Sequence, residues 1–410
     1  GNAWLIDGID NNEHTFNTVI VMPTLESVRE FKVLTGTYSA EFGRGFGVVS
    51  VSTKSGSNEF HGTLFEFLRN DVFDARPFFL LPTQKKTPLR RNQFGAAFGG
   101  PIKIPRLYDG QNRTFFFADY AGLREVRGSP YVNTVPTAKT RIGDFSEFTD
   151  TSGKLITIYD PQTTRPDPAN PGKFLRDPFA GNVIPQNRIN PVGFNVASIY
   201  PLPNVAGNFN NYVSTANRDV TDDAFTARVD HKLTEKNSFF VRYTFSNYWL
   251  NAPQGQANCC LPTPPEAAKK FDLGPFVAGI QNTHLRTQGL AINDSHIFRP
   301  NLINEFRTGF ARTTPRTVQS DFGHNAASSL GIQGINISEF TTGIANINVS
   351  DFTGLSGGPA FLPANPRETH YQVENNLYWN RSRHGLKFGY RYVRRLTSPF
   401  TNTDTRSTLN

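Results

Sequence analysis

The feature that most constrains the fold of this chain is a period-two alternation of apolar and polar residues. It is clearest over residues 223–248, where Phe225 and Val229 share one phase and Arg228 falls in the other. Successive side chains of a β-strand point to opposite faces of a sheet, so this alternation predicts strands with one apolar and one polar face. Turn-forming residues at 234–237 divide the segment into two such strands. The chain is therefore predicted to be all-β and antiparallel.

Nine segments follow this pattern closely enough to predict an antiparallel meander. The expected strands are 60–69, 92–103, 113–123, 223–233, 238–248, 285–297, 302–313, 370–381 and 386–396. Their connections alternate between a long set (70–91, 124–222, 249–284 and 314–369) and a short set (104–112, 234–237, 298–301 and 382–385). Alternate connections of a meander lie at the same end, so we expect all long loops at one end of the sheet and all short turns at the other.

This asymmetry separates two all-β architectures. A soluble antiparallel sandwich shows the same alternation, but both of its ends face water and neither end favours long loops. Outer-membrane barrels combine short periplasmic turns with long extracellular loops. The aromatic content of 13% agrees with a barrel, and the sequence has no apolar run approaching the roughly 20 residues of a transmembrane helix. We therefore predict a partial transmembrane β-barrel, with the long loops on one side.

In a barrel, the apolar phase faces lipid and the polar phase faces the lumen. The residues expected to face outward include Phe225, Val229, Val241, Tyr243, Phe388 and Tyr390. The lumen-facing polar candidates are Arg228, Asp230, Lys232, Arg242, Glu305, Arg307, Glu374, Lys387 and Arg391. Asn304 and Asn375 fall in the outward phase, for which a register slip or a β-bulge is one explanation.

A different pattern precedes the first strand. The run 48–51 is a short β-branched strand with glycines before it and a turn-forming TKSG sequence after it. The residues of this junction are Gly43, Gly45, Gly47, Thr53, Lys54, Ser55 and Gly56. The succession from apolar strand through TKSG into a phenylalanine-rich strand resembles TonB-dependent outer-membrane receptors of the Oar-like branch, at the point where the plug domain ends and the barrel begins.

The resemblance continues along the chain in RRNQFG at 90–95, GGPI at 99–102 and RIGDF at 141–145. It implies that residues 1–57 are the C-terminal part of a plug domain and that residues 58–410 are the N-terminal portion of the barrel. Large plugged transporters have about 22 strands, so nine strands are not expected to close such a barrel alone. The chain also begins without a charged and apolar leader, and we expect it to be an internal piece of a longer protein.

The function implied by the resemblance is that of a receptor and transporter in the outer membrane of a Gram-negative bacterium. It would contact outer-membrane lipid, bind an unidentified substrate at the cell surface, and import that substrate with energy from the TonB complex, which would act through a segment outside this chain. A surface adhesion or structural β-protein without transport activity is the alternative from another class. A glycan importer working with a surface lipoprotein is a third possibility, although no sequence feature selects saccharides.

The sequence gives no reason to expect an enzyme, a cofactor or a metal site. The eight histidines have neither HExxH nor paired metal-ligand spacing. Basic residues exceed acidic ones by 42 to 34, but they are spread along the chain apart from a small cluster at 85–91, so no nucleic-acid partner is expected. The adjacent Cys259 and Cys260 predict a vicinal disulfide or two free thiols in an exposed loop.

Two roles are open for the lumen-facing charges. They solvate the barrel interior and pair across neighbouring strands, or some of them hold the plug. The charges near the last plug strand that we expect to be complementary are Glu30, Glu41, Arg44 and Lys54. Polar contacts suit a plug that moves during transport better than an apolar core does.

Overall fold

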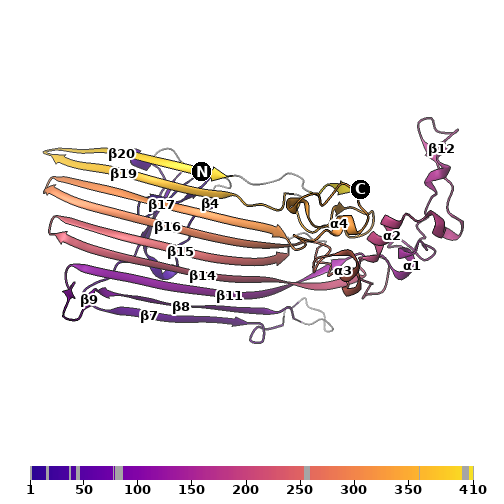
Figure 1. The fold of residues 1–410 in the computed structure, drawn as a ribbon, viewed down its shortest axis with the longest axis horizontal. Coiled ribbons are helices and arrows are strands. Elements are labelled where there is room, and N and C mark those ends of the chain that lie inside the picture. The colour runs from indigo at the N-terminus through magenta and orange to yellow at the C-terminus, as the bar shows by residue number, and fades with distance from the viewer. Residues whose placement is uncertain are drawn as a thin grey trace.

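A computed structural model describes residues 2–14, 18–36, 38–42, 47–76, 78, 86–253, 259–359, 361–398 and 406–409. Its main element is a nine-stranded antiparallel sheet in the order β20-β19-β17-β16-β15-β14-β11-β8-β7 (Figure 1). The strands are β7 (His61–Asn70), β8 (Leu89–Pro101), β11 (Thr114–Asn133), β14 (Tyr212–Thr234), β15 (Asn237–Pro253), β16 (Ile280–Arg299), β17 (Leu302–Gln319), β19 (Arg367–Arg381) and β20 (His384–Ser398). All nine predicted strands are confirmed, and each pairs with its neighbour in sequence.

Several strands are much longer than the alternation predicted. The longest, β14, has 23 residues against the eleven expected, and β11 pairs with it continuously from Thr114↔His231 to Asn133↔Tyr212. The apolar band of an outer-membrane barrel is only about 25 Å tall. Beyond that band both faces of a strand meet water, so the alternation that marks a strand in the sequence stops before the strand does.

A smaller unit lies against one face of the large sheet. We call residues 2–57 the inner subdomain; its four-stranded sheet has the order β2-β1-β6-β5. These strands are β1 (Ala3–Ile6), β2 (Ile9–Asp10), β5 (Val28–Leu34) and β6 (Val48–Thr53), and a hairpin of β3 (Asn12–Glu13) and β4 (Thr18–Val19) joins them. Two 3₁₀ turns complete the unit, Leu25–Ser27 and Ala40–Phe42.

The two faces of the large sheet differ as predicted. On the inner face, which meets the inner subdomain, Arg242 and Thr244 are 2% and 1% exposed. On the outer face Phe388 and Tyr390 are 55% and 67% exposed, and Val241 is partly exposed. The register around Asn304 and Asn375 has neither slip nor bulge. The side-chain amides of these two outward residues donate hydrogen bonds to each other, both at 3.0 Å. Their polar groups are therefore paired without a register slip or a bulge.

The long connections gather at one end of the sheet, and the short turns lie at the other (Figure 1). The first short connection carries the hairpin of β9 (Lys103–Ile104) and β10 (Tyr108–Asp109). The described residues of three of the long ones (134–211, 259–279, and 320–359 with 361–366) contribute to a unit that we call the loop cap. Its elements are α1 (Ala138–Arg141), α2 (Pro191–Ser198), α3 (Pro265–Phe271), α4 (Ala326–Ser329), β12 (Arg165–Pro166), β13 (Phe174–Leu175), β18 (Asn346–Ile347) and β21 (Thr408–Leu409).

The loop cap contains the largest apolar core of the described residues. Ile199, Leu261 and Leu330, one from each connection, are all fully buried in it. Cys259 and Cys260 form a vicinal disulfide beside this core. The expectation that they lie in an exposed loop is wrong, because the loop around them packs and leaves them 1% and 0% exposed. Among the described residues, no helix combines the length and apolar character needed to cross a membrane.

Candidate functional site

The interface between the inner subdomain and the large sheet is built around Asp7. This residue occupies the tight turn between β1 and β2 with φ of 49°, and Gly8 follows it with φ of 80°. A Cβ on Gly8 would lie 2.8 Å from Cδ of Arg307, so the turn also needs glycine to approach the sheet. The Asp7 carboxylate accepts hydrogen bonds from the backbone N–H and the hydroxyl of Thr53, at 2.9 and 2.8 Å.

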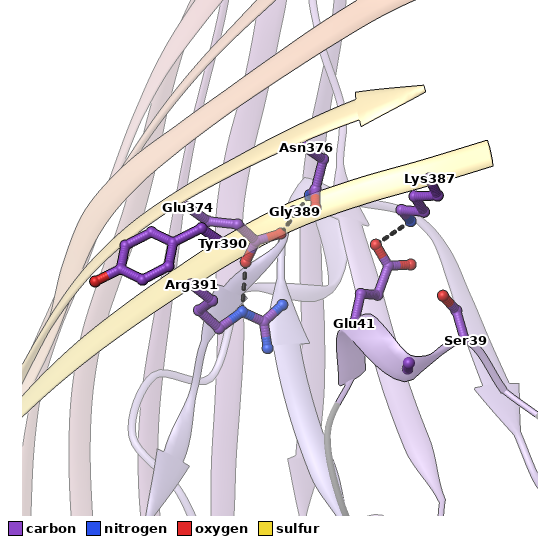
Figure 2. A pocket seen from close by; sticks show the side chains of 9 residues that line it. Ser39, Glu41, Glu374, Asn376, Lys387, Gly389, Tyr390 and Arg391 are labelled. Carbon is purple, nitrogen blue, oxygen red and sulfur yellow. Dashed lines mark hydrogen bonds and ion pairs between the residues drawn. The ribbon is translucent and has the colours of Figure 1, made fainter. Parts of the chain in front are cut away.

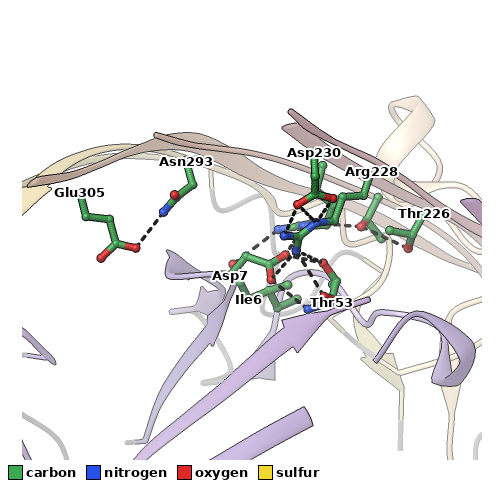
Figure 3. A network of polar contacts seen from close by, with 10 residues as sticks. Ile6, Asp7, Thr53, Thr226, Arg228, Asp230, Asn293 and Glu305 are labelled. Carbon is green, nitrogen blue, oxygen red and sulfur yellow. Dashed lines mark hydrogen bonds and ion pairs between the residues drawn. The ribbon is translucent and has the colours of Figure 1, made fainter. Parts of the chain in front are cut away.

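Two arginines of the large sheet reach the same carboxylate, and Figure 3 shows one of them, Arg228, beside Asp7 and Asp230. Arg242 on β15 donates from Nε to Asp7 Oδ2 at 2.8 Å, and the side chains are only 3% and 4% exposed. Arg228 on β14 lies 3.5 Å from Asp7 Oδ1, donates to Asp230, and stacks 3.9 Å over the ring of Phe240. Each buried charge therefore has an opposite charge and further hydrogen bonds, which is the condition for burying charge at acceptable cost.

A second network centres on Glu374 of β19, whose side chain is 2% exposed. Arg307 donates to it at 3.3 Å and Arg391 donates from Nε on the next strand. Asn376 and Gln372 add hydrogen bonds of 2.7 and 3.0 Å. Figure 2 shows Glu374 and Arg391 on one wall of a cavity of about 360 Å³.

The opposite wall of that cavity belongs to the inner subdomain. Glu41, in the 3₁₀ turn Ala40–Phe42, pairs with Lys387 of β20 (Figure 2). Elsewhere Asp10 pairs with Arg395 at 2.7 Å, and the amide of Gln372 both donates to the carbonyl of Gly8 and accepts from the N–H of Asp10. Ion pairs and amide contacts therefore extend along the interface from β14 to β20.

Apolar contact across the interface is small by comparison. One cluster joins Ile6, Ile20 and Val21 of the inner subdomain to Ala311 of β17. A polar interface of this kind can separate and form again, because water can solvate the charges that part. The contacts between the described residues of this interface are those that hold the inner subdomain against the sheet.

The predicted lumen-facing residues occupy the following places. Arg228 and Arg242 contact Asp7, and Lys387 contacts Glu41; Glu305, Arg307, Glu374 and Arg391 form the second network, and Asp230 supports Arg228. Lys232 is exposed beside the turn 235–236. Of the charges expected to be complementary, Glu41 crosses the interface, whereas Lys54 pairs with Glu26 and Glu30 with Lys32 inside the inner subdomain. Arg44 lies outside the described residues.

The junction residues bring the chain across to the first strand of the large sheet. Thr53 ends β6 against Asp7, and the N–H of Lys54 donates to the carbonyl of Ser27 at 2.7 Å. A Cβ on Gly56 would lie 2.2 Å from the carbonyl oxygen of Phe116, so only glycine fits there. Gly47 precedes β6, Ser55 lies between Lys54 and Gly56, and Gly43 and Gly45 lie outside the described residues.

Sequence reasoning missed Asp7, Asp10 and Gln372, which make direct contacts between the two units. Asp7-Gly8 carries a turn signal in the sequence, but that signal gives the local conformation and not the partner. The arginine partners of Asp7, Arg228 and Arg242, are more than 200 residues away in the sequence.

These features define a class of protein, the wall of a membrane β-barrel with an inner subdomain held to it by polar contacts; the nine strands form an open sheet with edges at β20 and β7. Comparison with known families identifies one family for most of the chain. The chain belongs to the outer membrane β-barrel domain family, whose model matches residues 52–410. The protein therefore resides in the outer membrane of a Gram-negative bacterium.

Individual relatives are transporters and receptors of the same membrane. The TonB-dependent transporter Oar of Myxococcus xanthus is 32% identical over 126 residues, which are 29% of this chain and 11% of that protein. This similarity confirms the predicted resemblance to TonB-dependent receptors. Among solved structures, the outer membrane transporter YddB of Escherichia coli and the siderophore receptor PirA of Acinetobacter baumannii are each 11% identical, with TM-scores of 0.47. Each alignment covers 96% of this chain and 40% of the other, so this chain spans less than half the length of these relatives.

Proposed function

We propose that this chain is the plug-to-barrel part of a TonB-dependent importer, with residues 1–57 in the plug and 58–410 in the barrel wall. The intact protein binds a substrate at the cell surface, and the TonB complex, acting through a segment elsewhere in the protein, moves the plug so that the substrate passes. On this proposal the chain is a transporter and not an enzyme, and its outer face contacts outer-membrane lipid.

The observation that carries the proposal is the buried pairing of Asp7 with Arg242. A subdomain that only stabilised the wall would be held best by apolar contact, because replacing a buried ion pair with apolar residues is often neutral or stabilising. An adhesin without transport has no need to release its inner subdomain. The lumen-facing charges therefore serve mainly to hold the plug reversibly, and they solvate the lumen when the plug moves.

The test is a triple charge reversal of Arg242, Arg307 and Arg391 to Glu in the natural protein. The reversal places like charges opposite Asp7 and Glu374, so we expect the plug to loosen and the barrel to leak. The measurements are single-channel conductance in planar bilayers and sensitivity of cells to a bulky antibiotic. The control reverses three exposed arginines at the short turns: Arg106, Arg299 and Arg383.

Wild-type conductance in the triple variant would show that these charges only solvate the lumen. Increased conductance with unchanged nutrient uptake by the cell would separate plug retention from transport and favour the alternative of a structural or adhesive protein.

A further inference from the structure

A second cluster of titratable side chains lies where the inner subdomain meets β19, separate from the Asp7 network. Asp10 ends β2, His14 follows β3, and His370 lies on β19 near the loop cap. One potential ligand atom from each of these three residues lies within 4.8 Å of the others. The two imidazole rings have centroids 5.3 Å apart. The fold thus gathers two imidazoles and a carboxylate from opposite ends of the chain.

His370 is oriented in the way that metal-binding histidines are. Its Nε2 is hydrogen-bonded to the carboxylate of Glu368, and the two side chains are 1% and 3% exposed. A carboxylate accepts hydrogen bonds, so Nε2 carries the proton and Nδ1 is left with a free lone pair. Among the described residues Nδ1 of His370 is buried without a hydrogen-bond partner. A carboxylate that fixes the tautomer and leaves the other nitrogen for an ion is the usual outer-shell arrangement at a histidine metal site.

The local charge also favours a cation. Asp10 and Glu368 contribute two negative charges, and Arg395, which pairs with Asp10 at 2.7 Å, contributes one positive charge. The pairing with Arg395 occupies one oxygen of Asp10, while the other oxygen accepts the N–H of Asn12 at 3.1 Å. A carboxylate has about four lone-pair positions, so Asp10 retains capacity for an ion. His14 is exposed and provides a route for entry from solvent.

We infer that Asp10, His14 and His370 form a site for a divalent transition-metal ion of the Zn²⁺ type, with Glu368 as the positioning residue for His370. Two imidazoles and one carboxylate, with water completing the shell, form a ligand set that Zn²⁺ accepts. Asp10 and His14 belong to the inner subdomain and His370 belongs to the wall. The ion therefore ties the two units together, and displacement of the inner subdomain divides the ligand set.

The geometry explains why binding would tighten this tie. Zn–N and Zn–O bonds of about 2.0–2.1 Å place neighbouring ligand atoms of a tetrahedral site about 3.3 Å apart. The ligand atoms here lie within 4.8 Å, so the groups must close on the ion. His14 is the group with room to move, because it is exposed and follows a two-residue strand.

The test uses the natural protein purified in detergent, stripped of metal and titrated with Zn²⁺ against a competing chelator. We expect one tight site in the wild type and affinity at least about 10-fold weaker in His14→Ala. Glu368→Gln should weaken binding by roughly 10- to 100-fold. His14 is exposed, so its removal leaves the fold intact even if a variant at the buried His370 does not fold. His384→Ala, an exposed histidine at the turn 382–383, is the matched control and should bind like the wild type.

The tie is measured separately by amide hydrogen exchange over residues 9–14. Zn²⁺ should slow exchange there in the wild type and leave it unchanged in His14→Ala. Equal Zn²⁺ affinity in the wild type and His14→Ala would overturn the site, and tight binding without slowed exchange would overturn the tie. Neither readout depends on transport, so a failure here is distinguishable from a failure of the proposed importer function.

Discussion

The inner-subdomain interface and the loop cap are both buried, yet they differ in the contacts that predominate. The interface relies on charged and amide side chains; those less than 3% exposed are Arg242, Glu368, His370, Gln372 and Glu374. The cap relies mainly on aliphatic side chains at the same level of burial, among them Ile199, Leu261, Leu330, Ile344 and Leu355, and it also holds the buried charge pair of Asp321 with Arg406 at 3.9 Å. Both regions join segments far apart in the sequence, so chain connectivity does not explain the difference.

The two kinds of contact suit the two regions to different behaviour. Apolar contact is non-directional and is lost only by exposing surface to water, so the cap is suited to stay assembled. A buried ion pair costs desolvation on folding, but the separated charges are well solvated in water. A contact that must open and close is better built from such pairs.

The strongest test removes the central carboxylate with Asp7→Ala. Arg242 would then remain buried without its main counter-charge, which should cost about 3–5 kcal/mol in the docking of the inner subdomain. Hydrogen exchange of β1 and β6 measures this loss, and exchange in the loop cap should stay unchanged. Glu30→Gln, which breaks an exposed pair with Lys32, is the control and should change docking by no more than about 1 kcal/mol. Equal effects of the two variants would contradict the comparison.

The converse test creates a cavity in the cap with Leu330→Ala. Leu330 is fully buried, and such a truncation typically costs about 2–5 kcal/mol. Protease resistance of the cap should fall, while exchange at β1 and β6 should not change. Leu202→Ala, at an exposed position of the same cap, provides the control. A variant that loosened the inner subdomain as much as the cap would show that the two regions form one cooperative unit.

The outer face of the sheet is a third environment, and Val241, the neighbour of Arg242 in the sequence, lies on it. Val241 points away from the inner subdomain, and an arginine placed there near the membrane midplane should cost roughly 2–4 kcal/mol. The effect is measured by folding the protein into lipid vesicles at increasing concentrations of urea in the buffer. Thr244→Val, on the inner face of the same strand, removes a hydroxyl that accepts from Arg242 at 2.9 Å and should cost only about 1–3 kcal/mol. Normal membrane insertion of Val241→Arg would refute the assignment of the two faces.

Acid should weaken the loop cap, although modestly. Hydrogen bonds lower the pKa of cap carboxyl groups: Arg188 acts on Asp160, Arg165 on Asp177, and the N–H of Asn325 on Asp272. Each folded-state pKa lies below the unfolded value near 3.8, so the unfolded state binds more protons and the contribution is lost as pH falls through the folded pKa. Asp321 opposes this trend, because burial raises its pKa.

The measurement is protease resistance of the cap between pH 5 and pH 2. Asp160→Asn should reduce the acid dependence, and Asp351→Asn, at an exposed cap position, serves as the control. A cap that became more resistant as the pH fell would show that Asp321 outweighs the other carboxyl groups.

The amino-acid sequence by itself determined the nine-strand meander, the end at which the loops gather and the two faces of each strand. These properties follow from local periodicity and connection length, which are visible without knowing any partner. The predicted strands were too short, because the apolar–polar alternation ends at the edge of the apolar band. For example, β14 begins at Tyr212, well before the predicted start at residue 223. The tertiary structure alone decided that Asp7 meets Arg242, that His14 meets His370, and that Cys259 is buried in an ordered cap. Each of these contacts joins segments separated by tens to hundreds of residues. The type of a charged or thiol side chain indicates what it can bind, but its partner is known only from the fold.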